Sequence, residues 1–309
     1  MQLPSRRVIA VNFIWAALSL LIFTFTPATA HAQGDLNGVI DFHVHSNPDS
    51  DQRSIDAIDL AQLAKQRGMR GLVLKNHYES TAALAYVVRK IVPGIEIFGG
   101  IDLNLTVGGM NPAAVERMTM VTGGWGRVVW MATNDNEAQV KSDKQNRPFV
   151  AISKDGHLLP EVEQVLDVIA KHQLVLETGH SSATDALLLV HEGKQKGIKH
   201  MVVTHAIASV VRMSIPQMQE AARDGAYLEF TYSTLIPKNA PFTTADYVRA
   251  IKAIGTEWCI LASDLGQKNN PLHPDGLAQY FKNLKQEGLT QAEIDLMSKT
   301  NPAKALGLE

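Results

Sequence analysis

Short apolar segments alternate with segments of helical periodicity along most of the chain. An apolar run at residues 38–46 is followed by apolar residues at helical spacing from Ile55 to Leu63, then by Gly68 and a second apolar run at 69–77. These runs are too short and too uniformly apolar to have one face in water, which is typical of parallel strands covered by helices. The pattern therefore predicts a repeated strand–helix unit.

The same unit recurs eight times. The predicted strands are residues 38–46, 69–77, 95–104, 127–134, 174–180, 200–206, 226–233 and 258–266. The predicted helices are residues 55–68, 82–91, 113–121, 160–169, 185–197, 215–225 and 244–255, with a closing helical region at 275–308. Eight alternating units predict an α/β fold, a single (β/α)8 TIM barrel, rather than an open doubly wound sheet, since no glycine-rich phosphate motif follows the first strand. The polar residues 135–156 interrupt the rhythm and are predicted to be an insertion after strand 4.

Residues 1–32 contain the parts of a secretory signal peptide. Arg6 and Arg7 precede an apolar stretch at 8–23, and Ala30 and Ala32 form a small-x-small exit. We therefore expect cleavage after Ala32, an exported protein that is periplasmic or secreted, and a mature barrel domain at 33–309 with no stable membrane anchor. The paired arginines also resemble a twin-arginine export signal. The alternative is an uncleaved anchor, because about sixteen apolar residues approach the lower limit for spanning a bilayer.

Composition and charge narrow the class of protein. A hydrophobic content of 45% and a formal net charge of −2 are typical of a globular enzyme and give no electrostatic basis for binding nucleic acid. The expected partner is a small molecule, and the oligomeric state is not readable from the sequence. Cys259 is the only cysteine, so no intramolecular disulfide can form and the core must stabilise the fold.

The first strand carries two histidines separated by one valine. Side chains alternate along a strand, so His43 and His45 point to the same face, as does Asp41. Two imidazoles on a rigid strand can bind zinc or a similar metal ion, although such a pair is more often structural. The metal hypothesis predicts further ligands at later strand ends.

The later strands end in residues of the required kind. His180, His205 and Asp264 end the fifth, sixth and eighth strands, and Lys75 and His77 end the second. Active sites of such barrels lie at the C-terminal ends of the strands, so these side chains are expected to converge at one mouth. By strand alternation, Glu177 is expected to face opposite to His180 and is therefore not counted among the residues that contact the metal.

This arrangement resembles the amidohydrolase superfamily of metal-dependent barrels over essentially the whole mature chain. The opening HVHSNPD at 43–49 looks like an uncharacterised branch of it. The resemblance implies metal ligands among the following residues: His43, His45, His180, His205 and Asp264. It also implies that Asp264 handles the proton of the attacking water. In mononuclear relatives the sixth-strand histidine polarises the substrate instead, a role that would fall to His205.

One departure concerns the bridge between two metals. Binuclear relatives usually carry a carboxylated lysine or a glutamate on strand four, and residues 127–134 end in neither. Lys75 is then either a carbamate bridge or a cation that orients an anionic substrate, and we expect the cation.

The expected function is a metal-dependent hydrolase. One divalent ion, zinc by preference, or else two ions, would activate water to cleave a C–N, C–O or P–O bond of a small molecule. Asp264, His205 and Lys75 are the expected catalytic residues, and His77 and Arg212 the expected substrate contacts. The alternatives are a metal-dependent decarboxylase of the same superfamily, a phosphoesterase with a related histidine pair, and a non-catalytic metal-binding protein.

Overall fold

The computed structural model describes residues 36–207, 210–236 and 240–308. The predicted signal peptide lies outside these residues, so its cleavage stays a prediction. Within the described ranges, no helix has both the length and the apolar character needed to cross a membrane.

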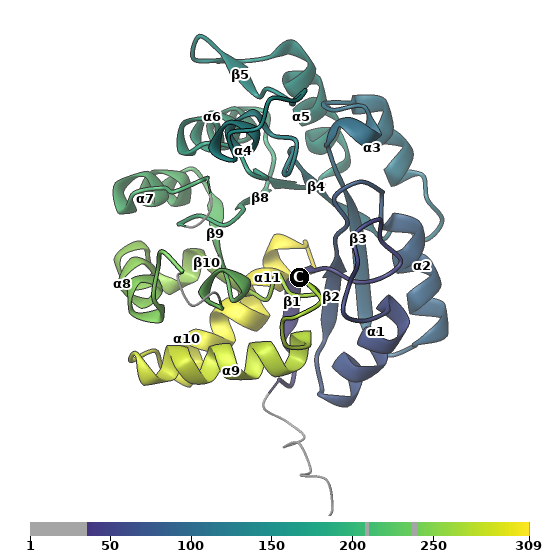
Figure 1. Cartoon of the computed structure of the whole chain (residues 1–309), viewed down its shortest axis with the longest axis vertical. Helices are drawn as coiled ribbons and strands as arrows, with labels where there is room; N and C mark the ends of the chain where they lie inside the picture. Colours follow the sequence, from purple (N-terminus) through teal and green to yellow (C-terminus); the bar gives the residue numbers. More distant parts are fainter. Residues whose placement is uncertain (1–35, 208–209, 237–239, 309) are drawn as a thin grey trace, which may run out of the picture. The chain divides into compact units, whose positions relative to one another are not determined.

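Eight parallel strands form one sheet in chain order, as Figure 1 shows. Each of them lies within a predicted strand or within one residue of it. The strands are β1 (Ile40–Val44), β2 (Gly71–Leu74), β3 (Glu96–Asp102), β4 (Gly126–Trp130), β7 (Val175–Glu177), β8 (His200–Val203), β9 (Ala226–Thr231) and β10 (Cys259–Ala262). The prediction of a (β/α)8 barrel is confirmed.

The barrel closes along a seam between β1 and the residues that follow β10. Val44 and Leu265 form a parallel bridge. The His45 amide donates to the Leu265 carbonyl at 2.9 Å, and the Asp264 amide donates to the His43 carbonyl at 2.9 Å. The backbone of three predicted metal ligands therefore makes the hydrogen bonds that close the barrel.

Helices cover the outside of the strands (Figure 1). Their starts carry the expected signals: Asn111 accepts from the Ala114 amide at the start of α3, and Thr243 forms a capping box with Asp246 at the start of α8. The helices between strands are α1 (Ala57–Gln66), α2 (Ala82–Ile91), α3 (Pro112–Thr119), α5 (Pro160–His172), α6 (Ala183–Gln195), α7 (Ile215–Arg223) and α8 (Thr244–Ile254).

The closing helical region is divided into several pieces. It comprises α9 (His273–Gln286), α10 (Gln291–Asp295), a π-helical turn at Leu296–Thr300 and α11 (Asn301–Ala305). The chain breaks at Gly288, which has a φ of 95°, and restarts at Thr290, which forms a capping box with Glu293.

The polar segment after β4 is an insertion, as predicted. It contains α4 (Glu137–Ser142) and a short hairpin of β5 (Ser153–Lys154) and β6 (His157–Leu158). Figure 1 shows the hairpin away from the barrel strands, and both Lys154 and His157 are exposed.

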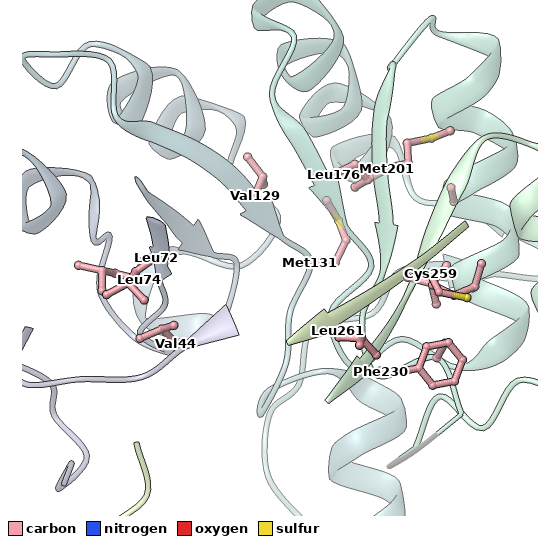
Figure 2. Close-up of a cluster of buried hydrophobic side chains, with 14 of the residues drawn as sticks. Val44, Leu72, Leu74, Val129, Met131, Leu176, Met201, Phe230, Cys259 and Leu261 are labelled. Atoms are coloured by element: carbon pink, nitrogen blue, oxygen red, sulfur yellow. The ribbon is translucent and has the colours of Figure 1, made fainter. Parts of the chain in front are cut away.

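Alternate side chains of each strand enter two separate apolar layers. On β4, Val128 and Trp130 lie in a cluster inside the barrel, whereas Val129 belongs to the layer between strands and helices. Figure 2 shows part of that outer layer, including Leu72, Leu176 and Leu261. The inner cluster also contains Ile40, the first residue of β1, and residues of α11, so apolar side chains fill the N-terminal end of the barrel. Polar side chains are concentrated at the opposite end.

Candidate metal centre

The two histidines of the first strand meet one carboxylate. His43 lies within β1 and His45 directly after it, and their Nε2 atoms lie 3.3 and 3.1 Å from Asp264 Oδ1. Both imidazoles are buried. The alternation that placed them on one face therefore brings both to a distant residue, which lies 219 positions after His45 in the sequence.

Asp264 and His205 share an unusual backbone conformation. Each has a φ of 49°, in the left-handed region, where aspartate, asparagine and histidine are among the more tolerant residues. Such conformations cost about 1–3 kcal/mol each and cluster at functional sites. His205 Nε2 lies 3.7 Å from Asp264 Oδ2, and the Ser233 hydroxyl donates to the same oxygen at 2.6 Å. Donor atoms of His43, His205 and Asp264 all lie within 4.8 Å of one another.

Two further imidazoles border this trio. The His180 ring centroid lies 5.4 Å from that of His205, and the His77 ring centroid lies 4.9 Å from that of His45. His180 follows Gly179, whose φ is 61° and where an added Cβ would lie 2.1 Å from the Met131 carbonyl oxygen. Close packing on β4 therefore directs His180 towards the other imidazoles. The structure gathers all five predicted ligands, with His45 and His180 outside the trio of His43, His205 and Asp264.

Glu229, on β9, orients two of the imidazoles. Its Oε1 lies 3.1 Å from His43 Nδ1, and its Oε2 accepts from the His205 amide at 3.2 Å. Thr231 Oγ1 lies 3.2 Å from His205 Nδ1. With both Nδ1 atoms occupied, the Nε2 atoms face Asp264. A carboxylate behind a histidine is the usual support of a metal ligand.

We predict that Glu229→Gln weakens metal binding about tenfold or more, since outer partners of metal ligands typically contribute 10–100-fold. The amide lacks the negative charge and cannot accept at both of its terminal atoms. Metal affinity measured by competition with a chelator checks this. Glu96→Gln, at the half-buried start of β3, is the control and should bind metal like the wild type. Equal affinity in the two variants would refute the supporting role of Glu229.

The electrostatics of the site favour a metal cation. Burial lowers the pKa of His43 and of His45 to about 3, and burial also lowers the pKa values of His180 and His205. These imidazoles are therefore neutral near pH 7 and keep a nitrogen lone pair. Burial opposes ionisation of Asp264, but His43, His45 and His205 hold its pKa well below the usual value. Neutral imidazoles around one carboxylate form a donor set that fits a divalent ion such as zinc.

Lys75 lies at the edge of this donor set. Its Nζ lies 3.2 Å from His43 Nε2, 3.8 Å from Asp102 Oδ2 and 5.4 Å from the centre of the Trp130 ring, and the side chain is fully buried. Asp102 supplies a compensating charge that the sequence did not suggest. The signal was present, because Asp102 follows the uncharged run 97–101 at the end of β3.

Carboxyl groups beneath the histidines form a buried polar layer. Burial raises the pKa of Asp41, Asp102 and Glu229 to about 7 and raises that of Glu177 well above its usual value. Two of them support neighbouring backbone and hydroxyl groups: Asp41 accepts from the Ser263 amide at 2.8 Å, and Glu177 accepts from the Thr204 hydroxyl.

The expectation that Glu177 faces away from His180 is wrong. Val175, two residues earlier on β7, lies in the inner cluster, and side chains alternate along a strand, so Glu177 faces the barrel interior. The strand ends at Glu177 and Gly179 turns into the left-handed region, so alternation no longer relates Glu177 to His180.

The loops after β1 and β10 are joined above the seam. The Ser54 amide donates to the Gly266 carbonyl at 2.8 Å, and Arg53 forms an antiparallel bridge with Gln267. Gly266 has a φ of 123°, and an added Cβ would lie 2.1 Å from the His45 carbonyl oxygen. Only glycine fits there without moving His45.

We predict that Gly266→Ala lowers the free energy of unfolding by about 2–4 kcal/mol, through steric strain at a special backbone position. The control is Gly156→Ala, because Gly156 also has a positive φ, 82°, but nothing lies within 4 Å of its added Cβ. Chemical denaturation of both variants separates two contributions to the loss of unfolding free energy: the steric clash with His45, and the strain of an alanine at positive φ. Equal losses would contradict the prediction.

Arg212 is exposed in the loop between β8 and α7, with a φ of 45°. His77 is closer to the centre, and its Nδ1 lies 2.9 Å from Thr133 Oγ1 and 3.4 Å from Asp102 Oδ2. The substrate contacts expected of both residues stay predictions.

Solved structures with this fold include hydrolases and a decarboxylase. An amidohydrolase from Pseudomonas aeruginosa is 12% identical, with a TM-score of 0.60 over 87% of this chain and 95% of that one. The organophosphorus hydrolase from Deinococcus radiodurans is 15% identical, with a TM-score of 0.60 over 88% and 93%. A 2,6-dihydroxybenzoate decarboxylase from Rhizobium is 12% identical, with a TM-score of 0.52 over 88% and 99%. The predicted resemblance to the amidohydrolase superfamily is thus confirmed at the level of the fold.

The sequence itself belongs to a family of unknown function, DUF6282, whose profile matches residues 38–229. No curated protein matches the sequence.

Proposed function

We propose that this protein is a metal-dependent hydrolase that uses one divalent ion, preferably zinc, to add water to a small-molecule substrate. One observation carries the proposal. The Nε2 atoms of two neutral, buried imidazoles, His43 in β1 and His45 directly after it, lie 3.3 and 3.1 Å from Asp264 Oδ1. The signal-like residues 1–32 support action outside the cytoplasm.

The two oxygens of Asp264 support a division of labour. Oδ1 faces His43 and His45, whereas Oδ2 faces His205 and accepts from Ser233. In the proposal His43, His45, His180 and Asp264 hold the ion. His205 is then left to act on the substrate.

When bound, a divalent ion supplies an electrostatic centre that makes water more acidic and stabilises negative charge on the substrate. Asp264 Oδ2 accepts a proton from the attacking water and passes it to the leaving group. His205 Nδ1 lies 3.2 Å from Thr231 Oγ1. In the proposal the Thr231 hydroxyl donates to Nδ1, so that the proton of the neutral imidazole lies on Nε2 and hydrogen bonds to the substrate oxygen that gains charge.

Metal analysis of the purified protein, together with turnover on lactones, amides, phosphoesters and hydroxybenzoates, tests the proposal. We expect one metal atom per chain and hydrolysis of one of the first three classes, lost on metal removal and restored by zinc. Release of CO2 from a hydroxybenzoate without hydrolysis of any other class would favour a decarboxylase. Protein that holds metal but turns over nothing would favour the non-catalytic alternative.

A further inference from the structure

Arg53 is buried in the loop between β1 and α1. Only 6% of its side chain is exposed, and its Nε donates to Asp49 Oδ2 at 2.6 Å. The Asp49 side chain is fully buried. Asp49 therefore satisfies the Nε donor of the guanidinium.

The Nη2 group of Arg53, in contrast, is buried and lacks a hydrogen-bond partner among the described residues. The Asp51 carboxylate lies 3.5 Å away, in an ion pair without hydrogen-bond geometry, and is half-exposed. An unsatisfied buried donor costs about 1–3 kcal/mol of stability. Pairing with Asp49 alone therefore leaves this cost at Nη2 without compensation.

The position of Arg53 connects it with the candidate metal centre. Its backbone pairs with Gln267, and the next residue, Ser54, donates to Gly266, two positions after Asp264. The positive charge of Arg53 also contributes to lowering the pKa of His43 and of His77. The guanidinium therefore lies on the loop that borders the mouth of the barrel.

The surrounding charges select the kind of anion. Asp49 balances the single positive charge of Arg53, and the half-exposed Asp51 carboxylate lies 3.5 Å from Nη2. These two carboxylates would repel a dianion such as phosphate more strongly than an anion with a single charge. A carboxylate has a single charge, and its planar pair of oxygens suits a guanidinium nitrogen.

We propose that Nη2 of Arg53 binds a carboxylate group of the substrate and so orients it towards the metal centre. This inference rests on the proposed function, and it names the substrate class as small molecules that carry a carboxylate besides the bond that is cleaved.

Calorimetric titration of the purified protein with benzoate, and with its neutral analogue benzamide, tests the anchor. We expect benzoate to bind at least tenfold more tightly than benzamide, in zinc-loaded and in metal-free protein alike. In Arg53→Met this preference should disappear, and in Arg53→Lys it should decrease. Arg70→Met, which removes an exposed arginine paired with Glu96, should keep it.

A second variant guards against misfolding, because Arg53→Met leaves the Asp49 carboxylate buried and unpaired. Arg53→Met with Asp49→Asn removes both charges and should also lose the preference for benzoate.

Two results would refute the proposed role of Arg53: equal binding of benzoate and benzamide to the wild type, or a preference for benzoate that survives in the double variant. Tighter binding of phenylphosphonate than of benzoate would overturn the choice of a carboxylate. Metal content separates the two proposals: protein that holds no zinc refutes the proposed function, whereas the titration of metal-free protein still decides on Arg53.

Discussion

Replacing Asp264 with asparagine should abolish turnover and lower metal affinity at least a hundredfold, while the barrel stays folded. Asparagine has the same shape and tolerates the φ of 49°, so the loss would report the missing charge rather than backbone strain. Oδ1 is the atom on which both first-strand imidazoles converge. Removing one ligand from a site of four usually removes the metal. Elemental analysis and chemical denaturation measure the two effects.

His205→Asn is the matched companion, because this position has the same φ. If one ion is held by His43, His45, His180 and Asp264, the variant should keep its metal and lose at least a hundredfold in kcat. Loss of the metal would instead make His205 a ligand and refute the proposed division of labour. Asp224→Asn, beyond the end of α7, serves as the control for both variants and should behave like the wild type.

Lys75→Met should leave one metal atom per chain and reduce kcat about a hundredfold. Methionine keeps the length of the side chain but removes the ammonium that lies between His43 and Asp102. Loss of one partner of a buried ion pair costs about 3–5 kcal/mol, so Lys75→Met with Asp102→Asn should recover stability without recovering activity. Metal content, kcat and unfolding free energy are measured together.

If Lys75 carried a carbamate that bridges two metal ions, the opposite effect on metal content would be expected. In that case the wild type holds two metal atoms, Lys75→Met loses at least one, and Lys75→Glu restores it with a carboxylate in the same place. Restoration by glutamate would refute the cationic role that we favour. A Lys75→Glu variant with the metal content and the low activity of Lys75→Met would support it.

Much of the fold was predictable because each strand is apolar on both faces and each connection contains a helix. The α2 helix at Ala82–Ile91 has the predicted bounds. The prediction was poorer in the tail, where Gly288 and Thr290 outweigh the amphipathic pattern, because local breaks are decided by backbone conformation and capping rather than by periodicity.

The convergence of the candidate metal ligands was predictable for a topological reason. Parallel strands present their C-terminal ends to one side, so polar residues at strand ends converge whatever their distance in the sequence. Glu229 and Asp102 were missed because an acidic residue within an apolar strand does not reveal which partner it has. Their partners, His43 and Lys75, belong to other strands. Glu177 was misplaced because its strand ends sooner than the apolar run.

The seam of the barrel has a consequence for the order of events in the cell. The amides of His45 and Asp264 close the barrel, and their side chains form the centre of the site. During synthesis the first-strand histidines leave the ribosome long before Asp264, so a nascent chain has imidazoles without their carboxylate. In the proposal, metal capture therefore follows the exit of Asp264 from the ribosome. If the paired arginines near the N-terminus direct export of folded cargo, the ion would be acquired in the cytoplasm and carried out with the protein.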